Sequence, residues 1–250
     1  MKKRFSQVFL VNKKVAREMI EKMNLKKGEY VLEIGPGKGI LTKILLEKKV
    51  KVIAIEIDRN LCRYLRENIL DLDFSLIEGD FLKINIKEIL DKFNLKKVKL
   101  LSNVPYNITT PLLIRLIRER ENFSEIYLTL QKEVVERINA KPGTKEFSSL
   151  TIFINFYTDI KVLMPIPAHF FYPKPKVNSL FFRMIPKEKL QIEKEKEEIF
   201  FKLVRRAFQE RRKKIGKILK EFGLYEKVPE EIREKRPDQI SIEEYIKIIL

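Results

Sequence analysis

Residues 30–46 read YVLEIGPGKGILTKILL, and this stretch decides the fold. Its first five residues are mostly apolar, as in a buried strand, and a helical pattern begins after the third glycine. Gly35, Gly37 and Gly39 therefore form a tight turn between a strand and a helix, where backbone N–H groups can approach a ligand. Their spacing, G-x-G-x-G, matches neither the dinucleotide fingerprint nor a P-loop.

Strand-like runs alternate with amphipathic stretches from residue 30 to about residue 140. The runs are YVLEI at Tyr30, KVIAIEI at Lys51, FSLIE at Phe74, VKLLS at Val98 and EIYLTL at Glu125. This alternation predicts an α/β fold with a mostly parallel, Rossmann-like sheet and crossover helices. Two more strand-like runs flank a proline-rich segment and could close the sheet with antiparallel strands; they are SLTIFINFY at Ser149 and VNSLFFRMI at Val177.

Past Pro186 the pattern is helical and rich in Glu and Lys, without a further strand signal. We therefore predict two domains, a catalytic domain over residues 1–188 and a small all-α domain over residues 189–250. Within the second, residues 202–220 hold nine Lys or Arg and one acid, Glu210, and are expected to form one basic helix.

The composition points to a polyanionic partner. The 250 residues carry 52 Lys and Arg against 35 Asp and Glu, a formal net charge of +17. Such an excess favours nucleic acid ahead of an anionic membrane surface. Most of it lies outside residues 31–140, which hold 19 basic and 16 acidic residues.

The residue types that are scarce exclude other classes. One cysteine, Cys62, and one histidine, His169, rule out an internal disulfide and the usual zinc ligand sets, so we expect no metal. No apolar run reaches the length of a membrane span, and the first residues do not form a secretion signal. We therefore expect a cytoplasmic protein with no membrane partner.

Acidic residues surround the glycine turn. Glu56 ends the next strand, 21 residues after Gly35, where a carboxylate can accept both hydroxyl protons of a ribose. Asp80 ends the strand after that, and Glu33 precedes the turn. Three carboxylates repel a pyrophosphate but suit a ligand with a sulfonium, an amine and a ribose. S-adenosylmethionine, with S-adenosylhomocysteine as its product, is thus favoured over a nicotinamide dinucleotide.

The fourth strand-like run leads into Asn103, Val104, Pro105 and Tyr106. Because a residue before proline favours an extended backbone, the Val104 carbonyl can point into the site beside the Asn103 amide oxygen. Two such acceptors hold the hydrogens of a planar exocyclic amine, while the Tyr106 ring stacks on the heterocycle. Accepting those hydrogens favours a tetrahedral nitrogen whose lone pair attacks the sulfonium methyl group, so no general base is needed.

Seven motifs in chain order carry a family resemblance. They are FSQVFL at Phe5, EIGPGKGILT at Glu33, Glu56 with Asp58, GDF at Gly79, NVPYNITTPL at Asn103, LQKEVVERINAKPGTKEFSSL at Leu130 and FYPKPKVNS at Phe171. Together they resemble the KsgA/Dim1 family of ribosomal RNA small-subunit adenine N6,N6-dimethyltransferases. The resemblance implies a class I methyltransferase fold and S-adenosylmethionine-dependent methylation of two adjacent adenosines near the 3′ end of small-subunit ribosomal RNA, in ribosome biogenesis.

The resemblance also implies roles by position. For the cofactor, the implied residues are Gln7, Val8 and Leu10 as an enclosing segment, Gly35 under the methionine part, Glu56 at the ribose, Asp80 and Phe81 at the adenine, and Asn103. For the target, they are Asn103, Val104 and Pro105 at the amine, with Tyr106 and Phe171 sandwiching a flipped adenine. The chain departs from the family at Ser6, where the family usually has glycine.

Phosphate contacts give nucleic-acid binding most of its affinity, and the basic stretch offers them. We expect Arg211, Arg212, Lys213 and Lys217 to contact RNA, and the segment FQERRKKIGKIL resembles the family's C-terminal domain. The expected partner is small-subunit ribosomal RNA or the immature small subunit, bound by a monomer.

Two alternatives stay open. A large-subunit ribosomal RNA adenine N6-methyltransferase of the antibiotic-resistance type shares these motifs, although the motif at Leu130 favours the small-subunit group. A ribosome-assembly or transcription factor could also keep the fold without turnover. Intact Glu56, Asp80, Asn103 and Tyr106 argue for catalysis.

Overall fold

The structure is a computed structural model that describes residues 8–104 and 108–250. The chain forms two compact units, the first comprising Met1–Lys132 and Ile160–Pro186, the second Glu133–Asp159 and Lys187–Leu250. The predicted boundary at residue 188 lies close to the last junction, but residues 133–159 group with the C-terminal helices. That residues 1–188 and 189–250 are independent domains stays a prediction.

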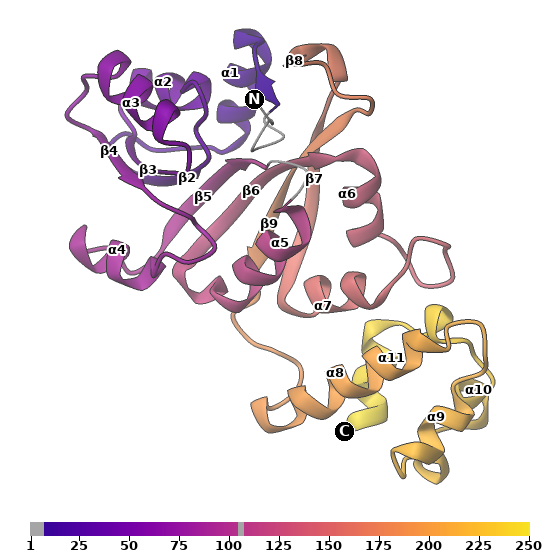
Figure 1. The fold of residues 1–250 in the computed structure, drawn as a ribbon. Helices are drawn as coiled ribbons and strands as arrows, with labels where there is room; N and C mark the ends of the chain where they lie inside the picture. The colour runs from indigo at the N-terminus through magenta and orange to yellow at the C-terminus, as the bar shows by residue number, and fades with distance from the viewer. Residues whose placement is uncertain (1–7, 105–107) are drawn as a thin grey trace. The chain divides into compact units, whose positions relative to one another are not determined.

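The first unit is built on a seven-stranded sheet with the order β4-β3-β2-β5-β6-β9-β7 (Figure 1). Its strands are β2 (Tyr30–Ile34), β3 (Lys51–Glu56), β4 (Phe74–Glu78), β5 (Val98–Asn103), β6 (Phe123–Gln131), β7 (Thr158–Ile166) and β9 (Ser179–Pro186). The pairs β2–β3, β2–β5, β3–β4 and β5–β6 are parallel, and β9 is antiparallel to β6. The predicted parallel sheet with an antiparallel closing strand is confirmed.

Five helices accompany these strands in the chain. They are α1 (Lys13–Lys22), α2 (Ile40–Glu47), α3 (Arg59–Asn68), α4 (Ile86–Lys92) and α5 (Thr109–Arg118), with a 3-10 turn η2 (Arg120–Asn122). Helices α1, α2 and α3 bury apolar side chains in one cluster with β2, β3 and β6. In that cluster the Tyr127 ring stacks on Phe181 with centroids 5.9 Å apart. This packing fixes the sheet edge at which the glycine turn lies.

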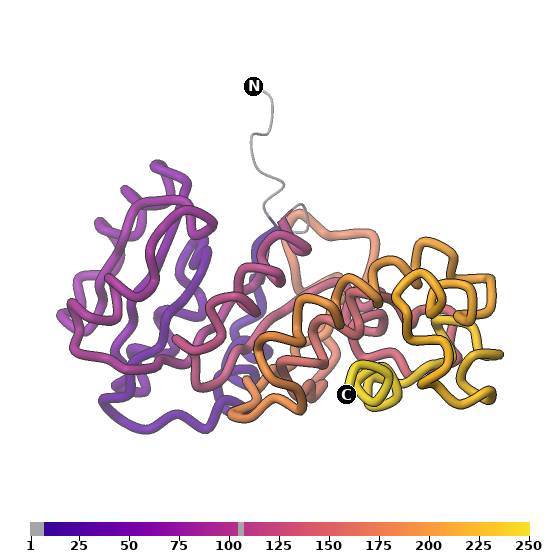
Figure 2. Tube along the Cα trace, turned by 90° about the horizontal axis from the view of Figure 1, so that it is seen from below, coloured from indigo at the N-terminus to yellow at the C-terminus, as the bar shows by residue number. Residues whose placement is uncertain are grey.

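A second, two-stranded sheet joins distant parts of the first unit. Strand β1 (Phe9–Leu10) pairs antiparallel with β8 (Phe171–Tyr172), which follows the short turn η3 (Ala168–Phe170). Leu10 opposes Phe171, and both are buried in the apolar cluster. Strand β1 therefore lies beside the segment around residue 171 (Figures 1 and 2).

The second unit is helical. Its elements are α6 (Lys132–Ile138), α7 (Ser149–Tyr157), α8 (Lys194–Gln209), α9 (Gly216–Glu221), η4 (Tyr225–Lys227), α10 (Glu230–Arg233), η5 (Pro237–Gln239) and α11 (Ile242–Ile249). Helix α7 packs on α8, and α11 packs on both. None of the helices in the described part of the chain has the length and apolar character needed to cross a bilayer.

The strand predicted for SLTIFINFY is wrong, because these residues form α7. Ser148 begins the helix with a capping box, in which its side chain accepts a hydrogen bond from the Thr151 backbone N–H. Phe153 and Phe156 contact the aromatic rings of α8, with a centroid separation of 4.9 Å between Phe156 and Phe200. A helix buried on several sides shows no amphipathic period, so its apolar run looks like a strand.

The single basic helix expected over residues 202–220 is also wrong. Helix α8 ends at Gln209 and α9 begins at Gly216, with a turn between them. In that turn Lys213 N–H donates to the Glu210 carbonyl at 2.8 Å. Three of the four residues expected to bind RNA therefore lie in a loop between helices.

Candidate active site

The carboxyl ends of β2, β3, β4 and β5 meet at one edge of the sheet, since these strands are parallel. Gly35 follows β2, Glu56 ends β3, Asp80 follows β4 and Asn103 ends β5. The sheet topology thus brings together Gly35, Glu56, Asp80 and Asn103, whereas the predicted site residues Leu10 and Phe171 lie in a separate two-stranded sheet. Gln7, Pro105 and Tyr106, which the sequence also places in the site, lie outside the described residues.

The glycine turn is held by β3. Gly35 N–H donates to the Ile55 carbonyl at 2.9 Å, and Gly37 N–H donates to Glu56 Oε2 at 3.3 Å. Gly37 has φ +59, which L side chains rarely adopt, and a Cβ there would lie 2.9 Å from Cδ1 of Phe9. Two constraints therefore require glycine here, and the second is imposed by β1.

Glu56 is buried and anchored by backbone donors. Its Oε1 accepts hydrogen bonds from the N–H groups of Ile57 and Asp58, each at 2.9 Å, in addition to the Gly37 bond. Burial raises the pKa of Glu56, and these three N–H donors act against that rise. The backbone thus orients a carboxylate at the end of β3, between the glycine turn and the start of α3.

Glu33 differs from the sequence-based picture of a carboxylate facing the ligand. Its side chain is 2% exposed, and Oε2 accepts a 2.6 Å hydrogen bond from the Thr42 hydroxyl of α2. Burial raises its pKa to about 7, the Thr42 bond opposes this, and the charge of Glu56 adds to it. Glu33 therefore ties β2 to α2 beneath the glycine turn.

Asp80 and Phe81 begin the segment after β4. Asp80 Oδ1 accepts a hydrogen bond from Leu82 N–H at 2.9 Å, and its carbonyl accepts from Lys83 and Ile84. Phe81 is buried, and the Arg115 guanidinium of α5 lies 5.3 Å from the ring centroid. The Asp80 carboxylate is thus fixed by a local turn through one oxygen, with Phe81 packed behind it.

Asn103 links the end of β5 to the N-terminal segment. Its Nδ2 donates to the Val8 carbonyl in a long hydrogen bond of 3.5 Å, which leaves the amide oxygen as an acceptor. Val104 N–H donates to the Thr129 carbonyl of β6 at 3.3 Å, and the Val104 side chain is buried. Two neighbouring residues before and in β1 thus contact the site: Val8 bonds Asn103, and Phe9 lies against Gly37, which bonds Glu56.

The Phe171 ring is buried in this structure. It is 4% exposed and packs in the apolar cluster with Leu10. The next residue, Tyr172, is 72% exposed. The stacking role expected for Phe171 stays a prediction, and it requires the ring to be uncovered.

Sequence reasoning missed Thr129. It opposes Asn103 in the β5–β6 register, is 1% exposed, and its Oγ1 has no hydrogen-bond partner among the described residues. A polar residue inside the apolar run EIYLTL was the available signal. Thr129 adds a buried hydroxyl beside the end of β5.

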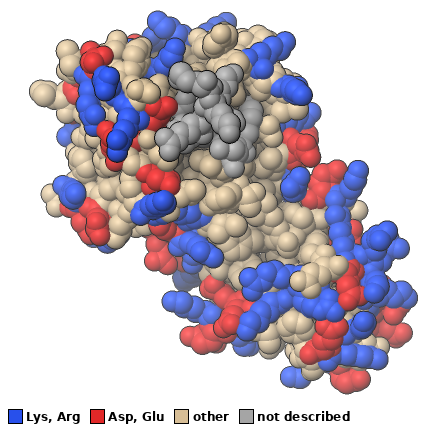
Figure 3. Space-filling view, viewed as in Figure 1, with Lys and Arg blue, Asp and Glu red and all other residues tan. Residues whose placement is uncertain are grey.

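The basic stretch of the second unit is partly neutralised by its own Glu210 and by Glu221, which ends α9. Arg206 pairs with Glu210 and Glu221, each at 2.8 Å, and Lys213 also pairs with Glu210 at 2.8 Å. Lys and Arg side chains gather over the region of α8–α11, with Asp and Glu among them (Figure 3). Arg212 and Lys217 are exposed and form no ion pair with an acid in the described ranges 8–104 and 108–250, although the charge of Lys217 helps to lower the pKa of Glu210.

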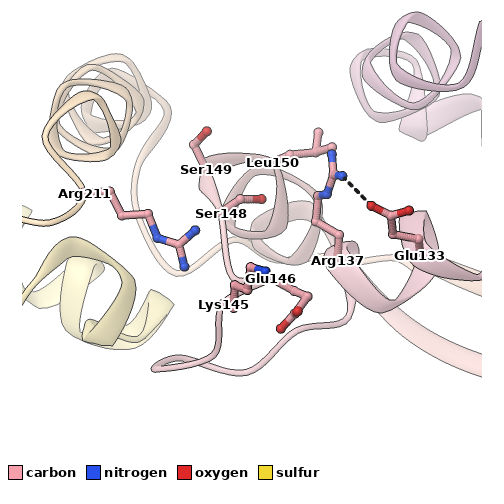
Figure 4. Close-up of a pocket in the computed structure, with 8 residues that line it drawn as sticks. All are labelled: Glu133, Arg137, Lys145, Glu146, Ser148, Ser149, Leu150 and Arg211. Atoms are coloured by element: carbon pink, nitrogen blue, oxygen red, sulfur yellow. Dashed lines mark ion pairs between the residues drawn. The ribbon is translucent and has the colours of Figure 1, made fainter.

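Arg211 is used inside the unit. Its guanidinium donates to Asp238 at 3.1 Å and to the Thr144 carbonyl at 3.0 Å. It borders a groove of about 460 Å³ that also touches the start of α7 (Figure 4). The lining residues are Glu133, Arg137, Lys145, Glu146, Ser148, Ser149, Leu150 and Arg211. Arg137 pairs with Glu133 at 3.6 Å, so the groove carries both signs of charge.

Comparisons with known proteins agree over almost the whole chain. The family model described as "Ribosomal RNA adenine dimethylase" matches residues 1–248. The ribosomal RNA small subunit methyltransferase A of Clostridium acetobutylicum is 37% identical, over 98% of this chain and 91% of its own length. The protein of the same name from Chlorobaculum parvum is also 37% identical, over 99% of this chain and 88% of its own length.

Two solved structures share the fold. A dimethyladenosine transferase from Plasmodium falciparum has a TM-score of 0.77 and 28% identity, covering 96% of this chain and 95% of its own. The 23S rRNA methyltransferase ErmE has a TM-score of 0.73 and 21% identity, covering 96% and 98%. The expected class I methyltransferase fold with a C-terminal helical part is therefore confirmed.

Proposed function

The chain belongs to the ribosomal RNA adenine dimethylase family, and from this we propose its reaction. It is an S-adenosylmethionine-dependent methyltransferase that dimethylates the N6 amines of two adjacent adenosines near the 3′ end of small-subunit ribosomal RNA, in ribosome biogenesis. The observation that carries the proposal is the meeting of the glycine turn, Glu56, Asp80 and Asn103 at one sheet edge. The curated relatives named for the small subunit support the choice of RNA.

The residues at the sheet edge fit S-adenosylmethionine. Gly35 permits close approach of a ligand to the backbone, since it has a positive φ and a Cβ there would meet no atom within 4 Å. We assign the ribose hydroxyls to Glu56, whose carboxylate is already oriented by three N–H donors. We assign the adenine amine to Asp80, with Phe81 beside it, and the remaining contacts to Gln7, Val8, Leu10, Gly35 and Asn103. When bound, the cofactor supplies an electrophilic methyl group on a sulfonium.

The target amine is activated by acceptors instead of a base. We propose that the Asn103 amide oxygen and the Val104 carbonyl accept its two hydrogens, which raises the availability of the nitrogen lone pair. Pro105 would keep Val104 extended, and Tyr106 and Phe171 would hold the adenine from both sides. For that sandwich, RNA binding has to uncover the Phe171 ring.

In this proposal, basic side chains of the second unit bind the ribosomal RNA. Arg212 and Lys217 are the strongest candidates of the predicted set, because they are exposed and no described acid pairs with them. Lys213 shares Glu210 with Arg206, and Arg211 is bonded within the unit. We further propose that residues 189–250 act as an RNA-binding domain, and that the protein works as a cytoplasmic monomer.

A methyl-transfer assay with two RNAs tests the proposal. The protein is incubated with methyl-labelled S-adenosylmethionine and either immature small subunits or naked large-subunit ribosomal RNA. Label in small-subunit RNA alone is expected. Label in large-subunit RNA alone would support the large-subunit alternative, and RNA binding without label would support a non-catalytic factor.

Asn103→Ala separates chemistry from binding in the same assay. We expect methyl transfer to fall by at least about 100-fold, as for loss of one transition-state acceptor, while RNA affinity stays within about 2-fold. Equal transfer by variant and wild type would contradict the role given to Asn103.

A further inference from the structure

Tyr172 stands out among the aromatic side chains of the described residues. It is 72% exposed, and the next most exposed Phe or Tyr there, Tyr64 of α3, is 37% exposed. Its neighbour Phe171 is 4% exposed, because successive strand residues point to opposite faces. A single exposed ring is ordinary by itself, so the case for a ligand rests on where Tyr172 lies and on the charges beside it.

The position of Tyr172 lies at the candidate active site. In the two-stranded sheet it opposes Phe9, whose ring closes on Gly37 of the glycine turn. One residue before Phe9, the Val8 carbonyl accepts the hydrogen bond of Asn103. Tyr172 therefore pairs with the strand whose Phe9 meets the glycine turn, and the residue before that strand, Val8, bonds Asn103.

Tyr172 is also held firmly and sits among positive charges. Its backbone pairs with β1, Val11 N–H donates to the Phe170 carbonyl at 2.9 Å, and buried Phe171 anchors the strand. The chain continues as PKPK, in which Lys174 and Lys176 are exposed. No acid among the described residues is within ion-pairing distance of either lysine. A fixed aromatic ring followed by two free cations matches a platform for a nucleic-acid base and its phosphates.

We propose that the Tyr172 ring stacks on an unpaired base of the RNA substrate that neighbours the methylated adenosines, with Lys174 and Lys176 contacting the adjoining phosphates. The inference rests on the proposed function and adds a positioning residue to it. Stacking tolerates any base, so Tyr172 contributes affinity and placement while Asn103 contributes the chemistry.

Three variants test the proposal: Tyr172→Ala, Tyr172→Phe and, as a matched exposed tyrosine elsewhere in the first unit, Tyr64→Ala. Affinity is measured by fluorescence anisotropy of a labelled single-stranded RNA with two adjacent adenosines. Tyr172→Ala is expected to weaken binding by about 5-fold or more, the lower end for one base stacked on an aromatic ring. Tyr172→Phe and Tyr64→Ala are expected to stay within about 2-fold.

Further readouts distinguish placement from folding and from failure of the proposed function. In Tyr172→Ala the KM for RNA should rise with kcat little changed, while the affinity for S-adenosylhomocysteine and the melting temperature stay at wild-type values. Unchanged RNA affinity in Tyr172→Ala, or an equal loss in Tyr172→Phe, would overturn the stacking role. If wild-type protein binds this RNA but methylates no RNA, the proposed function fails while the binding comparison still decides the role of Tyr172.

Discussion

Gly37 connects three parts of the first unit at a single residue. Its N–H contacts Glu56, its φ is +59, and the missing Cβ leaves space for the Phe9 ring. A glycine-rich turn could be predicted from the spacing in residues 35–39. The contact with Phe9 could not, because it depends on a strand pair between residues far apart in the chain.

Replacing Gly37 with alanine should therefore destabilise the protein more than a left-handed backbone conformation alone would, because the new Cβ also clashes with Phe9. Gly28 has φ +77 and no atom within 4 Å of a Cβ, so Gly28→Ala serves as the matched control with strain only. We expect Gly28→Ala to lower the free energy of unfolding by about 1 kcal/mol and Gly37→Ala by more, with weaker binding of S-adenosylhomocysteine in Gly37→Ala alone. Urea unfolding and calorimetric titration measure both quantities. An equal loss of unfolding free energy in the two variants would argue against Phe9 as the reason for glycine.

Glu33 makes stability depend on pH. Burial raises its pKa from 4.5 to about 7, so between these values the native protein holds a proton that the unfolded chain releases. The stability contributed by the neutral form is fully present below pH 4.5 and is lost as the pH rises through about 7.

Glu33→Gln keeps an acceptor for the Thr42 hydroxyl but cannot ionise. We expect its free energy of unfolding to match the wild type near about pH 4 and to exceed it near about pH 8, since only the wild type then buries a charge. Urea unfolding at both pH values checks this. A difference between variant and wild type that is the same at both pH values would rule out the titration of Glu33.

At the scale of elements, the parallel strands could be predicted because each is short, apolar and followed by a turn or an acid. The run SLTIFINFY could not be assigned correctly from its residues, since β-branched and aromatic side chains also fill a helix that is buried on several sides. The helix is stabilised by packing such as that of Phe156 on Phe200, a contact between segments far apart in the chain. The break between α8 and α9 has a similar origin, since Ile215 N–H donates to the Lys235 carbonyl.

The basic residues in and after the loop between α8 and α9 have two different roles in this account. Arg212 and Lys217 bind RNA, whereas Arg211 forms hydrogen bonds inside the second unit. Reversing the charge of Arg212 and Lys217 together to Glu should weaken RNA binding and reduce the salt slope of log affinity by about 2, with no change in melting temperature. Arg211→Ala should instead lower the free energy of unfolding by about 1 to 2 kcal/mol, because it removes the bonds to Asp238 and Thr144. Filter binding at several salt concentrations and thermal unfolding measure these effects. An unchanged salt slope in the double variant would remove Arg212 and Lys217 from the RNA-binding surface.

At the scale of the whole molecule, the net charge indicates the kind of partner, and the fold indicates the kind of reaction. The net charge of +17 indicates a polyanion, and the motifs indicate methyl transfer from S-adenosylmethionine. The fold does not choose between ribosomal subunits, since a 23S rRNA methyltransferase has a TM-score of 0.73 with this chain. The choice of the small subunit rests on sequence similarity over the full chain. Target choice therefore needs a direct measurement.

Mass spectrometry of nuclease-digested RNA tests the central claim most directly. Immature small subunits are incubated with S-adenosylmethionine and either the wild-type protein or Asn103→Ala, and the modified nucleotides are located. Two adjacent N6,N6-dimethyladenosines near the 3′ end are predicted with the wild type and none with the variant. Modification at any other position, or the same two dimethyladenosines with Asn103→Ala, would contradict the account.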